Sequence, residues 1–145
     1  MFTLLDVRRA IGNGAFFARG RSYAQEGRVE RVVVEEKQGQ SLYRAMVRGS
    51  GGIRYGVMFA YDDGRGKFTQ CGCDCPAFPC AEFGCKHVAA LMITVCEQSD
   101  AEDALRRRER LERERREAQA RELEAWRAWE RHQAEEREQL ERERR

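Results

Sequence analysis

The spacing of apolar positions near the N-terminus predicts two short helices. Residues 2–11 carry apolar side chains at helical spacing, and apolar residues three and four positions apart share one face of a helix. Residues 15–26 predict a second helix. Gly27 follows it at the position where the C-terminus of a helix favours a residue in the left-handed conformation.

Four segments after Gly27 have the length and the β-branched or alternating composition of strands. They are residues 28–37, 41–48, 53–61 and 67–71. Glycine-rich links at 49–52 and 62–66 join the last three of these segments, and such links are typical of antiparallel hairpins. The chain therefore predicts an α+β fold, in which a small antiparallel sheet follows the N-terminal helices.

Beyond Gly84, the spacing of apolar residues is again that of a helix. Apolar side chains recur at spacings of three and four, at Val88, Leu91, Met92 and Val95. This spacing places an apolar face on a helix that begins at His87, and we expect that face to pack against the sheet. Free thiols are readily buried, so Cys96 on the same helix is expected in the core.

Residues 99–145 consist mainly of Glu, Arg, Ala and Leu, which all favour helices. Pairs of Glu and Arg four residues apart, such as Glu138 and Arg142, each stabilise a solvated helix by about 0.2–0.5 kcal/mol. Ser99 and Glu102 match a capping box, which indicates either the start of a new helix or a break in the preceding one. The segment is predicted to be a long charged helix.

The large apolar residues of this charged segment are few and widely spaced. They are Leu105, Leu111, Leu123, Trp126, Trp129 and Leu140. Because they do not keep the a and d spacing over three heptads, we expect an extended or coiled-coil-like helix and not a strict coiled coil. The two tryptophans leave two interpretations open: they anchor a partner, or they pack on the domain or on a second copy of the helix.

The distribution of charge divides the chain in two. Residues 1–96 hold 13 Lys or Arg and 9 Asp or Glu, whereas residues 97–145 hold 14 and 16, which together give the 27 basic and 25 acidic residues of the chain. We therefore predict two parts, a domain at 1–98 and a charged helix at 99–145. The run of arginines from Arg106 to Arg108 is interleaved with Glu109 and Glu112, which favours a solvated salt-bridge face over a phosphate site.

Three thiols and one imidazole stand at the spacing of a metal site. Cys73 and Cys75 form one close pair, and Cys85 and His87 form another after nine intervening residues. Residues two apart at a strand end or tight turn share a face, so the first pair can present both sulfurs on one side, and Cys85 and His87 can complete the site from the first turn of a helix. Four ligands of this kind suit one tetrahedral Zn²⁺ with no open position, which makes the zinc structural. The predicted element is a ββα-like Cys3His zinc finger at about residues 69–97.

These residues resemble the SWIM-type zinc finger. The resemblance lies in Cys73-x-Cys75-Pro76-x-Phe78 followed by Cys85-x-His87-Val88-Ala89-Ala90-Leu91, and in the lead-in from Phe17 to Val29. It covers roughly residues 1–97. Two further thiols, Cys71 and Cys80, depart from the family pattern and leave open whether either replaces a ligand. The Cys75-Pro76 step matches the second Cys of the family pattern and favours Cys73 and Cys75.

The resemblance implies a non-catalytic module that binds DNA, a protein partner such as a helicase-like ATPase, or both. For the DNA interaction, the candidate contacts are basic residues on or beside the predicted strands: Arg28, Arg31, Arg44, Arg48 and Arg54. Two alternatives remain: a structural or oligomerising protein that works through its long charged helix, and a fragment of a larger SWIM-containing protein. The oligomeric state and the identity of the partner stay open.

The residues argue against the main enzyme classes that use such motifs. The sequence has no Gly-x-x-x-x-Gly-Lys-Ser/Thr loop for nucleotide phosphates. A zinc hydrolase needs an open coordination site and a nearby base, and Glu82 is the only acidic residue between the ligand pairs. The cysteine spacing also differs from the Cys-x-x-Cys of redox enzymes. We therefore expect no catalytic activity.

The chain has no apolar run of the ~18–20 residues that would span a membrane and no basic start followed by an apolar core. Six cysteines without an export signal favour reduced thiols and metal binding over disulfides. We expect a cytoplasmic protein that does not contact membranes.

Overall fold

The computed structural model describes residues 1–78 and 84–145. Cys80 and Glu82, which the sequence analysis considered, lie outside the described residues. The chain divides into two compact units, Met1–Asp100 and Ala101–Arg145.

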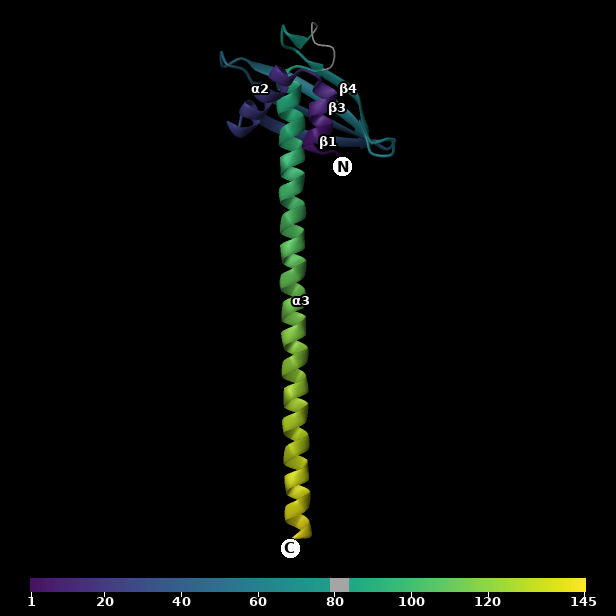
Figure 1. The fold of residues 1–145 in the computed structure, drawn as a ribbon, viewed down its shortest axis with the longest axis vertical. Helices are drawn as coiled ribbons and strands as arrows, with labels where there is room; N and C mark the ends of the chain where they lie inside the picture. Colours follow the sequence, from purple (N-terminus) through teal and green to yellow (C-terminus); the bar gives the residue numbers. More distant parts are fainter. Residues whose placement is uncertain (79–83) are drawn as a thin grey trace. The chain divides into compact units, whose positions relative to one another are not determined.

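The first unit contains two helices, a sheet and the start of a third helix (Figure 1). The elements are α1 (Leu4–Ile11), α2 (Gly14–Gln25), β1 (Val29–Lys37), β2 (Gln40–Arg48), β3 (Arg54–Asp62), β4 (Lys67–Cys73) and α3 (Lys86–Glu143). The strands form one antiparallel sheet in the order β1-β2-β3-β4. The predicted α+β fold is confirmed. The last strand extends to Cys73, two residues beyond its predicted end.

Short-range capping explains where the first two helices begin and end. The side chain of Thr3 accepts from the backbone N–H of Asp6, and the Asp6 carboxylate accepts from the backbone N–H of Thr3 in return. The second of these hydrogen bonds lowers the pKa of Asp6. The side chain of Asn13 caps α2. As the sequence predicted, Gly27 follows α2 in the left-handed conformation, with φ +69°. Its backbone N–H donates to the carbonyl of Ala24.

A β-bulge interrupts the pairing of β1 with β2. The register shifts between Glu30 and Val33, and Arg31 within this bulge has a φ of +55°. An extra residue in one strand re-aims the side chains around it. Arg31 consequently lines a groove on the sheet together with Val33.

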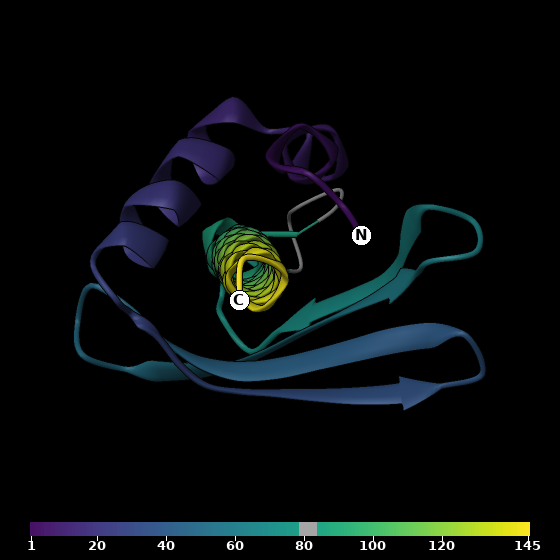
Figure 2. The same ribbon diagram turned by 90° about the horizontal axis from the view of Figure 1, so that it is seen from below.

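The helices of the first unit cover one face of the sheet (Figure 2). Between the two layers lies an apolar core, in which Val47, Val57 and Phe59 of the sheet and Leu91 and Ile93 of α3 are fully buried or nearly so. Side chains alternate between the two faces of a strand. The other residues of β2 and β3 point away from this core. They form the opposite face of the sheet, on which none of the described helices lies (Figure 2).

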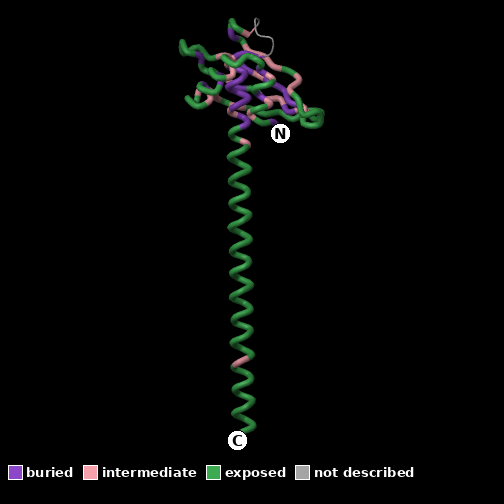
Figure 3. The backbone as a smooth tube through the Cα atoms, in the orientation of Figure 1, coloured by how far each residue is buried: buried purple, intermediate pink, exposed green. Residues whose placement is uncertain are grey.

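Helix α3 changes character along its length. Its residues from His87 to Cys96 are mostly buried, and Cys96 is 1% exposed, as expected for a core thiol. The helix continues through Ser99 without interruption, so the predicted alternatives of a break or a new start there are wrong. A capping-box pattern also fits the interior of a helix where no Gly or Pro follows it. From Ala101 onward every residue except Gln133 is exposed (Figure 3).

Gly20 allows α2 to approach the first turns of α3 closely. A Cβ atom at Gly20 would lie 2.5 Å from the Cβ of Ala89 and 2.8 Å from the carbonyl oxygen of Lys86. Both of these atoms belong to the first turns of α3, and neither is the end of a flexible side chain. The absence of a side chain at Gly20 therefore fixes the distance between the two helices.

We expect Gly20→Ala to lower the free energy of unfolding by about 1–3 kcal/mol, because an extra methyl group overpacks this contact. Gly14→Ala is the matched control, since the new Cβ has no neighbour within 4 Å and lies in the same helix. Urea unfolding of the full chain, followed by NMR signals of core methyl groups such as those of Val57, measures both variants. Equal stability of the two variants would contradict the close helix contact.

Candidate metal centre

The end of β4 positions the first two thiols. Cys73 is the last residue of the strand and pairs with Val57 of β3 on the face that the helices cover. Beyond it, the backbone N–H of Asp74 donates to the carbonyl of Gly56 at 3.2 Å, and the Asp74 carboxylate accepts from the N–H of Gly56 at 3.1 Å. These two bonds hold the strand end in place, and the chain then turns at Cys75.

The start of α3 positions the third thiol and the imidazole. Cys85 precedes the first helical residue, and its carbonyl accepts from the N–H of Ala89 at 2.9 Å. The backbone N–H of Val88 is one of the groups that lower the pKa of this thiol. Gly84 has φ +79°, and a Cβ there would lie 2.8 Å from Ile11. Glycine thus lets the chain enter the helix at this angle.

The structure brings together the four residues that the sequence proposed as ligands. One ligand atom from each of Cys73, Cys75, Cys85 and His87 lies within 4.8 Å of the others. The Nδ1 atom of His87 is 3.7 Å from the sulfur of Cys73 and 3.8 Å from that of Cys85. For Zn–S and Zn–N bonds of about 2.3 and 2.0 Å, a tetrahedral site separates S from N by about 3.5 Å. The group can therefore hold one metal ion.

The burial of the imidazole also fits a ligand role. His87 is 3% exposed, and the rings of Tyr55 and Tyr23 lie 4.7 and 5.7 Å from it. Its Nε2 atom is buried and has no hydrogen-bond partner among residues 1–78 and 84–145. Buried polar groups without a partner are uncommon. The nitrogen that faces the sulfurs is Nδ1, so a metal ion would bind that atom and would not supply a partner for Nε2.

The pKa values of the three thiols are shifted in different directions. The hydrogen bond from Cys73, followed by those from His87 and the backbone of Val88, lowers the pKa of Cys85 to about 4. The same hydrogen bond to Cys85, together with burial, raises the pKa of Cys73. Burial is also the main cause of the raised pKa of Cys75. The pKa of Cys85 is thus lowered while those of Cys73 and Cys75 are raised, and a bound cation would let all three thiols ionise.

The remaining thiols play different parts. Cys71 lies on β4 two residues before Cys73, is partly buried and has a pKa raised by burial. It is not a member of the group of four ligand residues. Cys96 lies in the core, where its thiol points to the carbonyl of Phe2 at 3.5 Å.

The five candidate arginines do not form one uniform basic surface. Arg28 pairs with Glu26 and lies over the ring of Tyr23, 4.4 Å from the ring centroid. Arg48 and Arg54 both pair with the carboxylate of Glu30, at 3.9 and 2.9 Å. The hydrogen bond from Arg54 is the main cause of the lowered pKa of Glu30. Sequence reasoning could not detect the two pairs with Glu30, because Arg48 and Arg54 are far from it in the chain.

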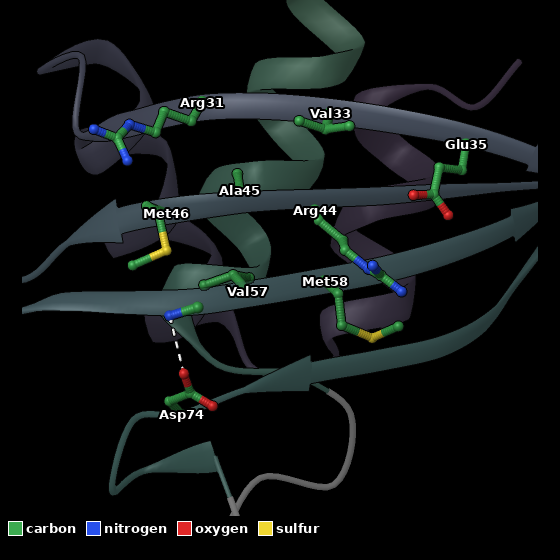
Figure 4. A pocket seen from close by; sticks show the side chains of 10 residues that line it. Arg31, Val33, Glu35, Arg44, Ala45, Met46, Val57, Met58 and Asp74 are labelled. Atoms are coloured by element: carbon green, nitrogen blue, oxygen red, sulfur yellow. Dashed lines mark hydrogen bonds between the residues drawn. The ribbon is translucent and has the colours of Figure 1, made fainter.

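The other two arginines line a groove on the open face of the sheet (Figure 4). The groove has a volume of about 530 Å³. The residues that line it include aliphatic, methionine, basic and acidic ones: Arg31, Val33, Glu35, Arg44, Ala45, Met46, Gly56, Val57, Met58 and Asp74. No sequence motif indicates this surface. The one indication in the sequence is the alternation of side chains along residues 41–48, which places Arg44 and Met46 on the same face of a strand.

Comparisons with known protein families, curated proteins and solved structures found no match for this chain. In the part of the chain that the structure describes, none of the helices is long and apolar enough to cross a bilayer.

We expect the purified chain to contain one zinc ion, and we expect Cys75→Ser, Cys85→Ser and His87→Ala each to lose it. Each substitution removes one of four ligands whose atoms lie close together in a buried site. Elemental analysis of the folded protein measures the metal content. Cys71→Ser is the matched control and should retain a full equivalent of zinc. Loss of zinc in the Cys71 variant, or its retention in the other three, would contradict this ligand set.

Proposed function

We propose that residues 1–98 are a zinc-binding interaction module of the SWIM type, in which the metal has a structural role. The observation that supports this proposal is the close group of three thiols and one imidazole. Sulfur and imidazole ligands in this combination suit Zn²⁺ better than the oxygen-preferring Mg²⁺ or Ca²⁺. The ligand pattern and the lead-in helix and strand are the features that resemble the SWIM family.

The proposed role of the zinc is to join the end of β4 to the start of α3. Cys73 ends β4 and Cys75 follows it closely, whereas His87 lies in the first turn of α3 and Cys85 directly precedes that helix. A unit of about 100 residues buries a modest core, and a structural metal adds stability to domains of this size. The metal would thereby fix the sheet that carries the groove.

We propose that the module is not an enzyme. Four protein ligands complete a tetrahedral shell, so the zinc would have no position for a water molecule or a substrate. Cys85 is fully buried and Cys75 and His87 are each 3% exposed. A metal enclosed in this way stabilises a fold and does not reach a substrate.

The open face of the sheet is the proposed docking surface, and its chemistry favours a protein partner. Met46 and Met58 supply adaptable apolar contacts of the kind found at protein-binding surfaces. Arg31 and Arg44 stand beside Glu35 and Asp74 in the same groove. A groove with both signs of charge complements a mixed protein surface, whereas its carboxylates would repel the phosphates of a nucleic acid. By the SWIM resemblance, a helicase-like ATPase is a partner of the proposed kind.

DNA binding remains a prediction of the sequence that these observations weaken. Three of the five candidate arginines are already paired with carboxylates of Glu26 and Glu30. Neutralised side chains release fewer counterions from DNA and contribute less to affinity. The remaining pair, Arg31 and Arg44, shares its groove with acidic groups.

Affinity purification of the tagged full chain from cells of its source tests the docking surface. We expect Arg44→Glu and Met58→Lys to reduce recovery of the bound protein at least tenfold, because both change the groove. Arg9→Glu makes the same charge change on α1 and should leave recovery unchanged. Equal recovery with all variants would contradict the assignment of this face. Binding of duplex DNA that falls steeply with salt and is lost in Arg44→Glu would assign the face to nucleic acid.

A further inference from the structure

The large apolar side chains of the second unit lie on one side of its helix. They are Leu105, Leu111, Leu123, Trp126, Trp129 and Leu140, and each is 50–57% exposed. At about 100° per residue, all six fall within about 120° of the circumference of an α-helix. We call this surface the Leu/Trp stripe. Its two indole rings lie beside each other, with centroids 5.1 Å apart.

We propose that the Leu/Trp stripe pairs with the same stripe of a second copy of this chain, with the two helices antiparallel. Large apolar side chains that are exposed on one side of a helix, here interspersed with charged residues such as Arg115 and Glu122, indicate an interaction site. The occupant is indicated by the order of charges along the helix. This proposal goes beyond the zinc-binding module and does not depend on it.

When two copies of the segment from residue 108 to residue 143 are aligned antiparallel, positive residues of one copy lie level with negative residues of the other. In an antiparallel pair with its two-fold axis between Ala125 and Trp126, a residue n of one helix lies at the level of residue 251 − n of the other. Arg108 then lies level with Glu143, and Arg115 with Glu136. Leu111 lies level with Leu140, because 111 and 140 also sum to 251.

This complementarity holds over the whole segment. Nine of its level positions pair an Arg with a Glu, and none pairs two side chains of like charge. The nine are 108 with 143, 109 with 142, 110 with 141, 113 with 138, 114 with 137, 115 with 136, 116 with 135, 121 with 130 and 124 with 127. An interface between two identical surfaces must be self-complementary about a two-fold axis. The charge order meets that requirement.

Only some of these pairs lie at the interface. Arg108, Arg115, Glu136 and Glu143 lie on the side of the helix that Leu111 and Leu140 share, at about 100° per residue. They would flank the apolar contacts as interhelical ion pairs, which set the partner and the orientation in helix pairs. The other pairs lie further round the helix and would contribute only a weaker, longer-range attraction.

A parallel pair would reverse the sign of these interactions. With two copies in register and parallel, Arg108 meets Arg108, and Arg115 meets Arg115, of the second helix. Like charges in such positions destabilise a helix pair. The charges that favour an antiparallel dimer therefore disfavour a parallel one.

Sedimentation equilibrium of the full chain in low salt tests the proposal. We expect a dimer whose dissociation constant rises at least tenfold in Glu136→Arg/Glu143→Arg, because Arg then faces Arg. Adding Arg108→Glu and Arg115→Glu to that variant should restore dimerisation, because the pairs become opposite in sign again. Glu124→Arg/Glu135→Arg is the matched control: it makes the same change in net charge away from the stripe and should have little effect.

Helix content measured by circular dichroism shows whether each variant stays folded, and only variants with wild-type helicity are compared. A chain that is monomeric up to about 100 µM would overturn the proposal. So would a dimer that the double reversal leaves intact, or one that the fourfold variant fails to restore, since a parallel pair keeps like charges together in both. The zinc content should be the same in all of these variants. A loss of dimerisation can therefore be distinguished from a loss of the metal.

Discussion

The first unit depends on the meeting of a strand end and a helix start inside its core. Cys73 ends β4 and Cys85 precedes α3, and their sulfurs lie 3.7 and 3.8 Å from the same imidazole nitrogen of His87. Three thiols cannot all ionise in so small a buried space unless a cation joins them. A metal ion in this position would connect the sheet to the helix that packs on it, so that ligand binding and burial of the core support one another.

The two faces of the sheet then have separate roles. One face and the helices that cover it bury Val57, Phe59 and Leu91 and hold the four candidate metal ligands. The other face presents the groove between Arg31 and Met58. The close approach of Gly20 to Ala89 and the four candidate ligands lie on the covered side, so substitutions on the open face, the proposed docking surface, should affect the fold less.

The sequence allowed much of the fold and all four grouped ligands to be predicted, because both depend on local spacing. Helical and alternating periods identify elements, and two pairs of ligands two residues apart identify a metal site. The ion pairs of Arg48 and Arg54 with Glu30 could not be predicted, because they form only when β1, β2 and β3 are aligned. The break expected at Ser99 was wrong because a capping box is a local pattern that packing and helix propensity on both sides override.

Amide hydrogen exchange of the full chain, with zinc and after its removal by a chelator, tests most directly whether a metal joins β4 to α3. We expect removal to lower the protection of the amides of Val88–Ile93 and of the paired residues of β4 by at least tenfold, because both elements lose their common anchor. Unchanged protection in these two segments after complete removal of the metal would contradict the account.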